Sequence, residues 1–426
     1  MAANHERKYV IRCPLHGFVT LWDWEREIIN QPAFQRLRRI RQLAWTDQVY
    51  PGAMHTRFEH SLGVMHVANA MFDRLVQNSK TLLNDELGFS QDAINNDRRL
   101  VRLAALLHDV GHSPFSHASE ELFPKHDGQQ LEHEEYSAEI VRRKINEVID
   151  GHVDSENTGI TAEKVASLLE GSTVGRSSIW RDIITGQLDA DRTDYLLRDS
   201  LHSGVDYGRF DWRRLIDCLS FVRTGEEGTG TRIGLSQGGF HAAEGLVLAR
   251  YFMFTQVYFH KTRVAFDCHL KGALKEILPD GKFPKFQIEG EIDHPDEYLK
   301  WDDWRVLGLL SQGEGGEHGR RLCERDHYRM VYETPETPTD DDKKRLEAVK
   351  NALGNKVRHE VSLGKAWYKF ASDDIPICSE NPEGIVRPLS EHSAAVKGIQ
   401  KTDKMMLYCL DEEKVEAKQI INTTEG

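Results

Sequence analysis

"LAALLHDVGHSPFSH", residues 103–117, joins an apolar run to a cluster of ionisable side chains. Leu103 to Leu107 has the composition of a buried helix end. The ionisable groups follow it directly: His108, Asp109, His112 and His117. Burying such groups costs free energy unless they are paired or bind a metal ion. The spacing of four predicts that the first two of these histidines share one helical face, so we expect a helix that forms the wall of a metal site.

The composition is that of a sizeable folded protein without membrane or secretion signals. The 426 residues are enough for one large core plus a smaller second domain. No apolar window reaches the length that spans a bilayer, and the N-terminus lacks the apolar stretch of a signal peptide. The six cysteines are scattered without a CxxC pair, which predicts reduced thiols and a cytoplasmic location. The net charge of −13 argues against a nucleic-acid coat.

Helical patterning dominates the first two thirds of the chain. Residues 1–25 predict short strands and turns, and Pro32 then stands where it would open a helix. Helical patterns continue to about residue 280, which predicts a mainly α bundle. Beyond that point "RDHYRMVYET" (325–334) alternates like a strand, and "ETPETPTDDDKKR" (333–345) has the composition of a polar linker. We therefore expect a core at residues 1–280 and a smaller α+β region at residues 281–426.

A divalent cation needs more ligands than one His-Asp pair. His60 stands at the start of a predicted helix, and "QLDADRTDYLLRDS" supplies several carboxylates. Two nitrogens and two carboxylates then come from His60, His108, Asp109 and one of Asp189, Asp191 or Asp194. Such mixed ligation suits Mn, Fe, Mg or Zn, and the ligand types alone do not choose among them. A lone His-Asp dipeptide is also frequent as a surface pair, so the motif by itself leaves both interpretations open.

An arginine cluster precedes these motifs in "FQRLRRIRQL". It contains Arg36, Arg38, Arg39 and Arg41. Such a cluster is either a solvated helix face or a site for phosphate-bearing ligands, to which arginine offers bidentate contacts.

Four motifs, in this order, resemble the HD-domain deoxynucleoside triphosphate triphosphohydrolases. They are "RFEHSLGVMH", "LLHDVGHSPFSHASE", "LEHEEYS" and "LDADRTDYLLRD". That family includes bacterial enzymes and the vertebrate sterile-alpha-motif–HD enzyme, and the resemblance covers about residues 9–270. It implies an HD-domain helical bundle as the catalytic core. It also implies metal-dependent hydrolysis of dNTPs to a deoxynucleoside and inorganic triphosphate, by oligomers that are commonly tetramers with regulatory nucleotides at their subunit contacts.

The resemblance assigns roles to individual positions around the metal. It selects Asp191 as the fourth ligand, which gives the set His60, His108, Asp109 and Asp191. The proton-transfer residues correspond to His112, His117, His133 and the carboxylate of Glu120, where the vertebrate enzyme has Asp. Hydrolysis of a phosphorus ester needs an activated water, a charge clamp and a proton for the leaving oxygen, and histidine suits the last task. Helix capping or a core hydrogen bond is the alternative role for His117 and His133.

The resemblance also assigns contacts to nucleotides. Positions that touch the substrate correspond to Arg57 and Arg192 at the triphosphate, Tyr195 and Asp199 at the sugar, Gln42 at the 3′-hydroxyl, and His260 and Lys261 at phosphate. Tyr195 is equally consistent with a plain core residue. Regulatory positions correspond to Gln35, Arg38, Arg214, Arg325 and Arg329. The vertebrate carboxylate that recognises guanine is replaced by Asn30, and basic residues are replaced by Tyr9, Ala243 and Gly245, so the activating base is left open.

Two rival functions remain beside dNTP hydrolysis. The first is another HD-type phosphohydrolase: a nucleotide phosphatase, a phosphodiesterase or a single-strand nuclease. The second is a non-catalytic assembly that senses nucleotides or binds nucleic acid through the arginine cluster. The nature of the products separates the enzymes, and ligand binding without turnover would indicate the assembly.

Overall fold

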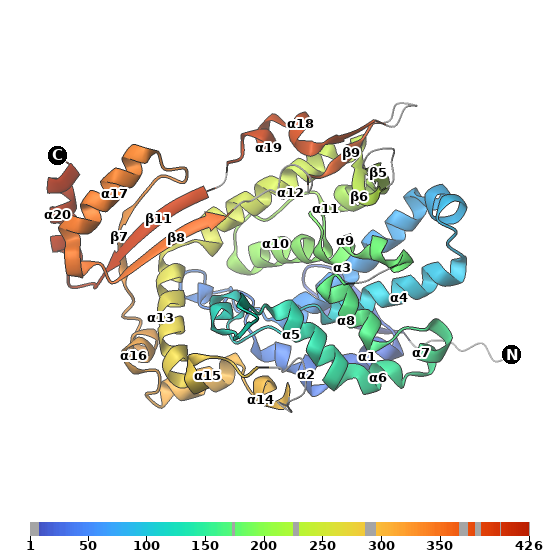
Figure 1. The fold of residues 1–426 in the computed structure, drawn as a ribbon, viewed down its shortest axis with the longest axis horizontal. Helices are drawn as coiled ribbons and strands as arrows, with labels where there is room; N and C mark the ends of the chain where they lie inside the picture. The colour runs from blue at the N-terminus through green and yellow to red at the C-terminus, as the bar shows by residue number, and fades with distance from the viewer. Residues whose placement is uncertain are drawn as a thin grey trace.

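The computed structural model describes residues 8–172, 175–224, 230–285, 295–365, 374–379, 385–400 and 402–425. The chain is mainly helical with a smaller mixed α/β part towards the C-terminus, as the sequence predicts. In Figure 1 the helices of the core fill most of the view, and at one end lies a unit made of β7 (Arg329–Glu333), α17 (Asp340–Leu353), β8 (His359–Lys365), β11 (Thr402–Cys409) and α20 (Lys414–Glu425). No helix in the described ranges is both long and apolar enough to cross a membrane.

The chain begins with an antiparallel hairpin of β1 (Tyr9–Cys13) and β2 (Gly17–Leu21), which confirms the predicted strands. Pro32 opens a helix as predicted, but α2 spans only Pro32–Gln35 and a 3-10 turn follows at Arg36–Arg39. The backbone then becomes extended because the Arg41 N–H donates to the Asp303 carboxylate rather than to a helical carbonyl. A distant part of the chain therefore ends this helical segment early.

Helices of very different lengths form the core and position the site. The first ones are α1 (Asp23–Ile29), α3 (Arg57–Asn78), α4 (Gln91–Leu107), α5 (His133–Ile140), α6 (Asn146–Asp150), α7 (Val153–Thr158) and α8 (Ala162–Glu170). They are followed by α9 (Asp182–Thr185), α10 (Ala190–Ser203), α11 (Trp212–Asp217), α12 (Phe240–Met253) and α13 (Lys261–Ile277). Helix α3 packs against both α4 and α10, so three helices that carry predicted ligands are direct neighbours.

Helix α4 ends at Leu107, directly before the first ionisable residue of the 103–117 motif. Residues Leu103–Leu107 are at most 1% exposed, which confirms the buried helix end. The predicted helical face shared by His108 and His112 is wrong, because the helix stops at Leu107 and a turn follows. Gly111 in this turn lies against α5 so closely that a Cβ atom would meet the Ser137 nitrogen at 2.3 Å. Any side chain at this position would clash with the backbone of α5.

A second sheet joins early and late parts of the chain. Strands β5 (Leu219–Thr224) and β6 (Gly230–Ser236) form a hairpin, and β9 (Pro376–Cys378) and β10 (Val386–Pro388) extend it in the order β10-β9-β6-β5. Strand β9 runs parallel to β6, with Leu235 opposite Ile377. The short helices α18 (Leu389–His392) and α19 (Ala394–Gly398) follow and pack against α12.

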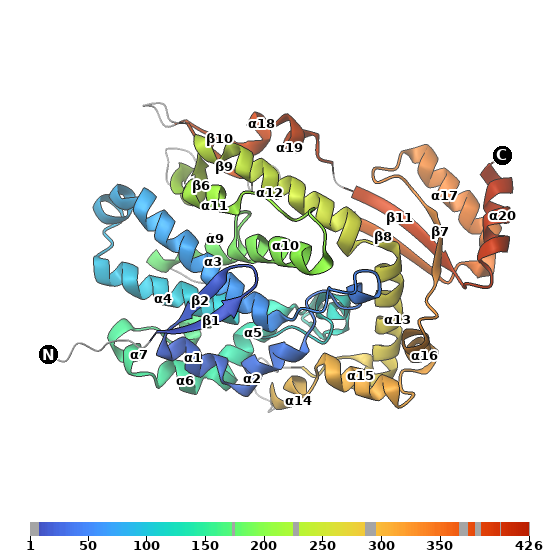
Figure 2. The ribbon, with the colours of Figure 1, turned by 180° about the vertical axis from the view of Figure 1, so that it is seen from behind.

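The C-terminal part has three layers, visible from behind in Figure 2. Its central sheet has the order β7 (Arg329–Glu333), β11 (Thr402–Cys409), β8 (His359–Lys365), so the predicted strand is confirmed. Helix α13 covers one face, and α17 (Asp340–Leu353) and α20 (Lys414–Glu425) cover the other. The polar stretch predicted as a linker ends at Thr339, whose capping box with Asp342 starts α17. The connecting helices are α14 (Pro295–Leu299), α15 (Asp303–Ser311) and α16 (Gly316–Glu324).

Candidate functional site

The four predicted metal ligands lie together, although they come from three helix termini. His60 lies in the first turn of α3, His108 directly follows α4, and Asp191 lies in the first turn of α10. The His60 Nε2 is 3.0 Å and the His108 Nε2 is 3.7 Å from the Asp191 Oδ1. Asp109 completes the group, with one oxygen 3.2 Å from the His108 Nε2 and the other 3.5 Å from the His60 Nε2.

This donor set fits a divalent cation. His108 donates from Nδ1 to the Ala105 carbonyl at 2.8 Å, so its buried Nε2 keeps a free lone pair. That Nε2 makes no hydrogen bond within the described part of the chain, although two carboxylates lie beside it. Burial lowers the pKa of His60, but hydrogen bonds to Asp191 and Asp194 outweigh it and raise that pKa to about 10. A proton and a cation therefore compete for the His60 nitrogen. His60, His108 and Asp191 place their ligand atoms close enough together to hold a metal, and Asp109 lies beside them.

The three carboxylates of the 189–194 segment have different surroundings. Asp191 faces the two histidines. Asp189 caps α10 by accepting from the Arg192 N–H at 2.7 Å. Asp194 accepts from the opposite nitrogen of His60, Nδ1, at 2.8 Å. The structure thus separates one ligand candidate from two supporting residues, a choice that the residue types alone left open.

Asp194 belongs to a buried network that the sequence did not reveal. It also accepts from His16 at 2.6 Å and from the Arg198 Nε and Nη2 at 2.8 and 2.9 Å. At Gly63 on α3 a Cβ atom would lie 2.0 Å from the Asp194 Oδ1, so only glycine leaves room for this arrangement. A carboxylate on the far nitrogen of a ligating histidine fixes its tautomer and ring orientation. The spacing of Asp194 and Arg198, four residues apart on α10, was the available signal.

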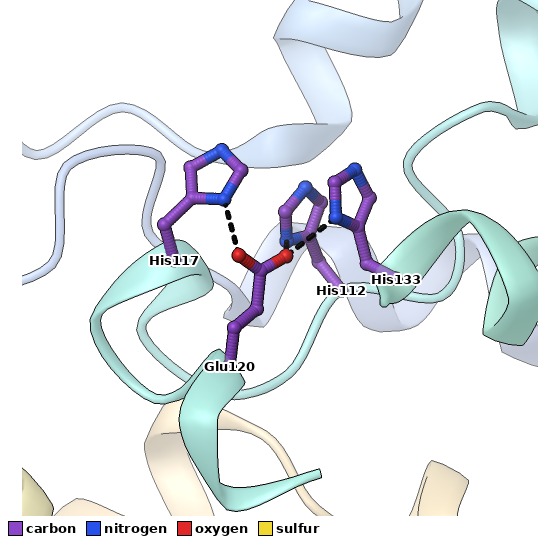
Figure 3. A group of neighbouring side chains, drawn as sticks. All are labelled: His112, His117, Glu120 and His133. Carbon is purple, nitrogen blue, oxygen red and sulfur yellow. Dashed lines mark hydrogen bonds and ion pairs between the residues drawn. The ribbon is translucent and has the colours of Figure 1, made fainter. Parts of the chain in front are cut away.

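The four residues predicted for proton transfer form a second group, drawn in Figure 3. Glu120 lies between the rings and accepts from the His117 Nδ1 at 2.7 Å and the His133 Nδ1 at 2.5 Å. The rings of His112 and His133 stack with their centroids 3.7 Å apart. The His117 side chain is 60% exposed, whereas that of His112 is fully buried. The group therefore reaches from the interior to solvent.

The environment pushes the pKa values within this group apart. Burial lowers the pKa of His133, but Glu134 and Glu120 outweigh it and raise that pKa to about 9. Burial and the nearby Arg57 guanidinium hold the pKa of His112 well below its usual range. Burial raises the pKa of Glu120, but His117 and His133 lower it far more. The result is a charged His133 beside a neutral His112, which is the arrangement of a proton donor next to an acceptor.

The predicted arginines at the triphosphate have unlike positions. Arg57 is buried, donates from Nη1 to the Asp109 Oδ2 at 2.7 Å and from Nε to the Ser116 Oγ at 2.9 Å. Arg192 instead bonds to the Asp189 carboxylate and the Gly186 carbonyl. Arg250 on α12, which the sequence did not single out, has a buried Nε without a hydrogen-bond partner among the described residues. Burial and the nearby Arg192 guanidinium lower the pKa of Arg250, and Tyr195 offsets this in part.

Of the residues predicted to contact the sugar, Asp199 already uses its oxygens within the protein. Asp199 is buried, and both oxygens accept hydrogen bonds, from the His55 Nε2 at 2.7 Å and the Tyr258 hydroxyl at 2.6 Å. Tyr195 is half-buried, with its ring centroid 6.3 Å from that of Tyr258. Gln42 is buried with an Oε1 that accepts no hydrogen bond in the described ranges.

The remaining predicted nucleotide contacts occupy separate places in one chain. His260 caps α13, and Lys261 lines a hollow of about 450 Å³ together with Arg329. Arg38 donates to Gln35 at 2.9 Å, and both lie near the short helix α2. Two others contact backbone carbonyls: Arg214 bonds to Gly238 at 3.1 Å and Arg325 to Gln48 at 3.2 Å.

Comparisons with known proteins relate this site to one family. The HD domain matches residues 57–197, and an HD associated region matches residues 210–362. A relative from Methanocaldococcus jannaschii is 37% identical over 63% of this chain and 50% of its own, so this chain spans half of that relative's length. The deoxynucleoside triphosphate triphosphohydrolase SAMHD1 homolog of Dictyostelium discoideum is 26% identical over 98% of this chain and 80% of its own. A hypothetical protein from Aquifex aeolicus has a crystal structure similar to this one, with a TM-score of 0.77 at 27% identity, over 97% of this chain and 100% of that chain.

Proposed function

Because this chain belongs to the HD-domain phosphohydrolases, we propose that it hydrolyses deoxynucleoside triphosphates to a deoxynucleoside and inorganic triphosphate. One observation carries the proposal: Asp109 joins the metal group to the proton-transfer group. Its oxygens lie 3.5 Å from the His60 Nε2, 3.2 Å from the His112 Nε2 and 2.7 Å from the Arg57 Nη1. The name of the Dictyostelium relative supports dNTPs as the substrate class.

The cation would be held by His60, His108, Asp109 and Asp191, as Mn, Fe, Mg or Zn. When bound, a divalent cation supplies Lewis acidity and an activated water for attack on phosphorus. Asp194 would keep His60 in the tautomer that presents Nε2 to the cation.

The side chains of this protein would do the rest. Arg57 neutralises charge that develops on the phosphate oxygens. The imidazolium of His133, held by Glu120, supplies the proton for the leaving oxygen, and His117 exchanges protons with solvent. Arg192 and Arg250, whose Nε has no hydrogen-bond partner among the described residues, would clamp the outer phosphates, for which Arg192 must leave Asp189. Tyr195 under the sugar would exclude a ribose 2′-hydroxyl, and Gln42, Asp199, His260 and Lys261 complete the proposed substrate contacts.

The assembly and regulation belong to the same proposal. We expect a cytoplasmic homo-oligomer, most simply a tetramer, with an activating nucleotide at subunit contacts. Gln35, Arg38, Arg214, Arg325 and Arg329 would take part, since these are the positions that the family resemblance assigns to regulatory nucleotides.

The test is product analysis with purified protein. Each dNTP is supplied singly and as a mixture, with Mn or Mg, and products are resolved by ion-pair chromatography. Deoxynucleoside with intact triphosphate, lost in Asp109→Ala and kept in His126→Ala (an exposed histidine outside the site), would support the proposal. Release of orthophosphate or monophosphate would favour another HD phosphohydrolase activity. Turnover only in mixtures would indicate an activator, and binding without turnover would refute the proposed function.

A further inference from the structure

Two consecutive residues of the loop that follows α4, residues 108–118, adopt a left-handed backbone without being glycine. Phe115 has φ +58° and Ser116 has φ +57°. A Cβ atom in this region comes too close to the following carbonyl oxygen, so the conformation is strained for both residues. Both residues are buried, so the loop cannot relax into solvent. Contacts from elsewhere must hold this conformation.

The strained pair determines where Arg57 points. The Ser116 Oγ accepts from the Arg57 Nε at 2.9 Å and donates to the Arg41 carbonyl at 2.7 Å. Arg57 in turn bonds to Asp109 at 2.7 Å. A rotation of the backbone at Ser116 would therefore move the guanidinium that faces the metal group.

Asp303, from the first turn of α15, binds both segments that meet at Ser116. Its Oδ1 accepts from the Phe115 N–H at 2.7 Å, and its Oδ2 accepts from the Arg41 N–H at 2.8 Å. The side chain is almost fully buried. Each carboxylate oxygen is thus used by one backbone donor. These two hydrogen bonds offset part of the burial that raises the pKa of Asp303 to about 7.

Two residues shortly before Asp303 are also connected to the loop, Tyr298 directly and Trp301 through Arg36. The Tyr298 hydroxyl donates to the Gly111 carbonyl at 2.5 Å. Arg36 donates from Nε to the Trp301 carbonyl at 2.8 Å and from Nη2 to the His112 carbonyl at 2.9 Å. The segment from Tyr298 to Asp303 therefore contacts the loop at its start and at its strained pair.

We propose that Asp303 is a positioning residue, which holds the left-handed pair at Phe115 and Ser116 and so aims Arg57 at the reacting phosphate. The role of Arg57 rests on the proposed function, whereas the hold on the loop does not. Asp303 lies in the HD associated region, so the proposal gives that region a direct part in shaping the HD-domain site.

The test replaces Asp303 by Asn, which keeps one acceptor oxygen and turns a donor towards the other N–H. The matched control is Asp302→Asn, since Asp302 caps α15 and binds Arg39 without contacting the loop. Hydrogen–deuterium exchange of peptides covering 111–118 should speed up by about tenfold in Asp303→Asn alone, while peptides of α3 stay unchanged and report that the fold is intact. Where dNTP turnover is present, kcat should fall by about tenfold to a hundredfold with KM within about twofold.

A second comparison separates backbone strain from the lost hydroxyl. Ser116→Ala and Ser116→Gly both remove the Oγ, but only glycine accepts the left-handed backbone without cost. Asp303→Asn should therefore raise exchange less in the glycine background than in the alanine background. Exchange in Asp303→Asn equal to that in Asp302→Asn, or an unchanged kcat despite faster exchange, would overturn the proposal. Faster exchange in a protein without dNTP turnover would leave Asp303 as a holder of the loop and refute the proposed function alone.

Discussion

Replacing Asp194 by Asn should weaken both the fold and the cation site. Asp194 accepts from His60, His16 and, twice, from Arg198, and all of these side chains are fully buried. The amide keeps one oxygen and loses the charge that balances the buried guanidinium. Breaking a buried ion pair in this way costs about 3–5 kcal/mol. At about 2.1 cal/mol/K per residue, the unfolding entropy of a chain this long is about 0.9 kcal/mol/K, so Tm should fall by about 3–6 °C.

The effect on the cation is separate from the loss of stability. Without the carboxylate on Nδ1, the His60 ring loses its fixed tautomer, and the affinity for Mn should fall by about tenfold to a hundredfold. Calorimetric titration of metal-free protein with Mn at 15 °C measures this while the variant is folded. Asp211→Asn, at an exposed helix cap on α11, is the control and should match the parent. An Asp194→Asn protein that binds Mn as tightly as the parent would refute the positioning role of Asp194.

Three further perturbations test two other residues of the site and one buried histidine outside it. Glu120→Gln removes one of the anions that raise the pKa of His133 to about 9. The alkaline limb of kcat plotted against pH should therefore move to lower pH. An unmoved limb would exclude His133 as the proton donor. Burial and the nearby His318 lower the pKa of His269 to about 3. Its contribution to the free energy of unfolding is therefore full above the unfolded pKa of 6.5 and is lost as the pH falls towards 3. His269→Gln, which still offers an acceptor to the Tyr328 N–H, should flatten this dependence of the unfolding free energy on pH, as measured in urea melts at pH 4–7. Arg250→Gln should lower kcat/KM for dNTPs by about tenfold to a hundredfold without changing metal content, and unchanged kinetics would remove Arg250 from the proposed site.

The metal group could be predicted from the sequence because two of its residues are neighbours in the chain. His108 and Asp109 are adjacent, and the apolar run before them is buried as its composition predicts. The ordered motifs then supplied His60 and Asp191, which the structure places beside the pair. The roles of these residues stay predictions until a cation is bound and measured.

What the sequence could not supply depends on contacts between distant segments. Asp189, Asp191 and Asp194 are the same residue type within six positions, and only the packing of α10 against α3 decides which one faces the histidines. Asp303 carries no local signal, since its partners at Phe115 and Arg41 are far away in the chain. The close approach of Gly111 to α5 likewise depends on a contact that no periodicity of α4 itself records.

The parallel pairing of β9 with β6 has a consequence for synthesis of the chain. Strand β6 leaves the ribosome with one edge paired to β5, and its other edge must wait until most of the remaining chain has been made. During that interval a nascent chain exposes backbone donors and acceptors beside an apolar core, which is the state that recruits chaperones or aggregates. Completion of the core sheet therefore falls near the end of translation, and a chain that stalls before β9 is released with an open sheet edge.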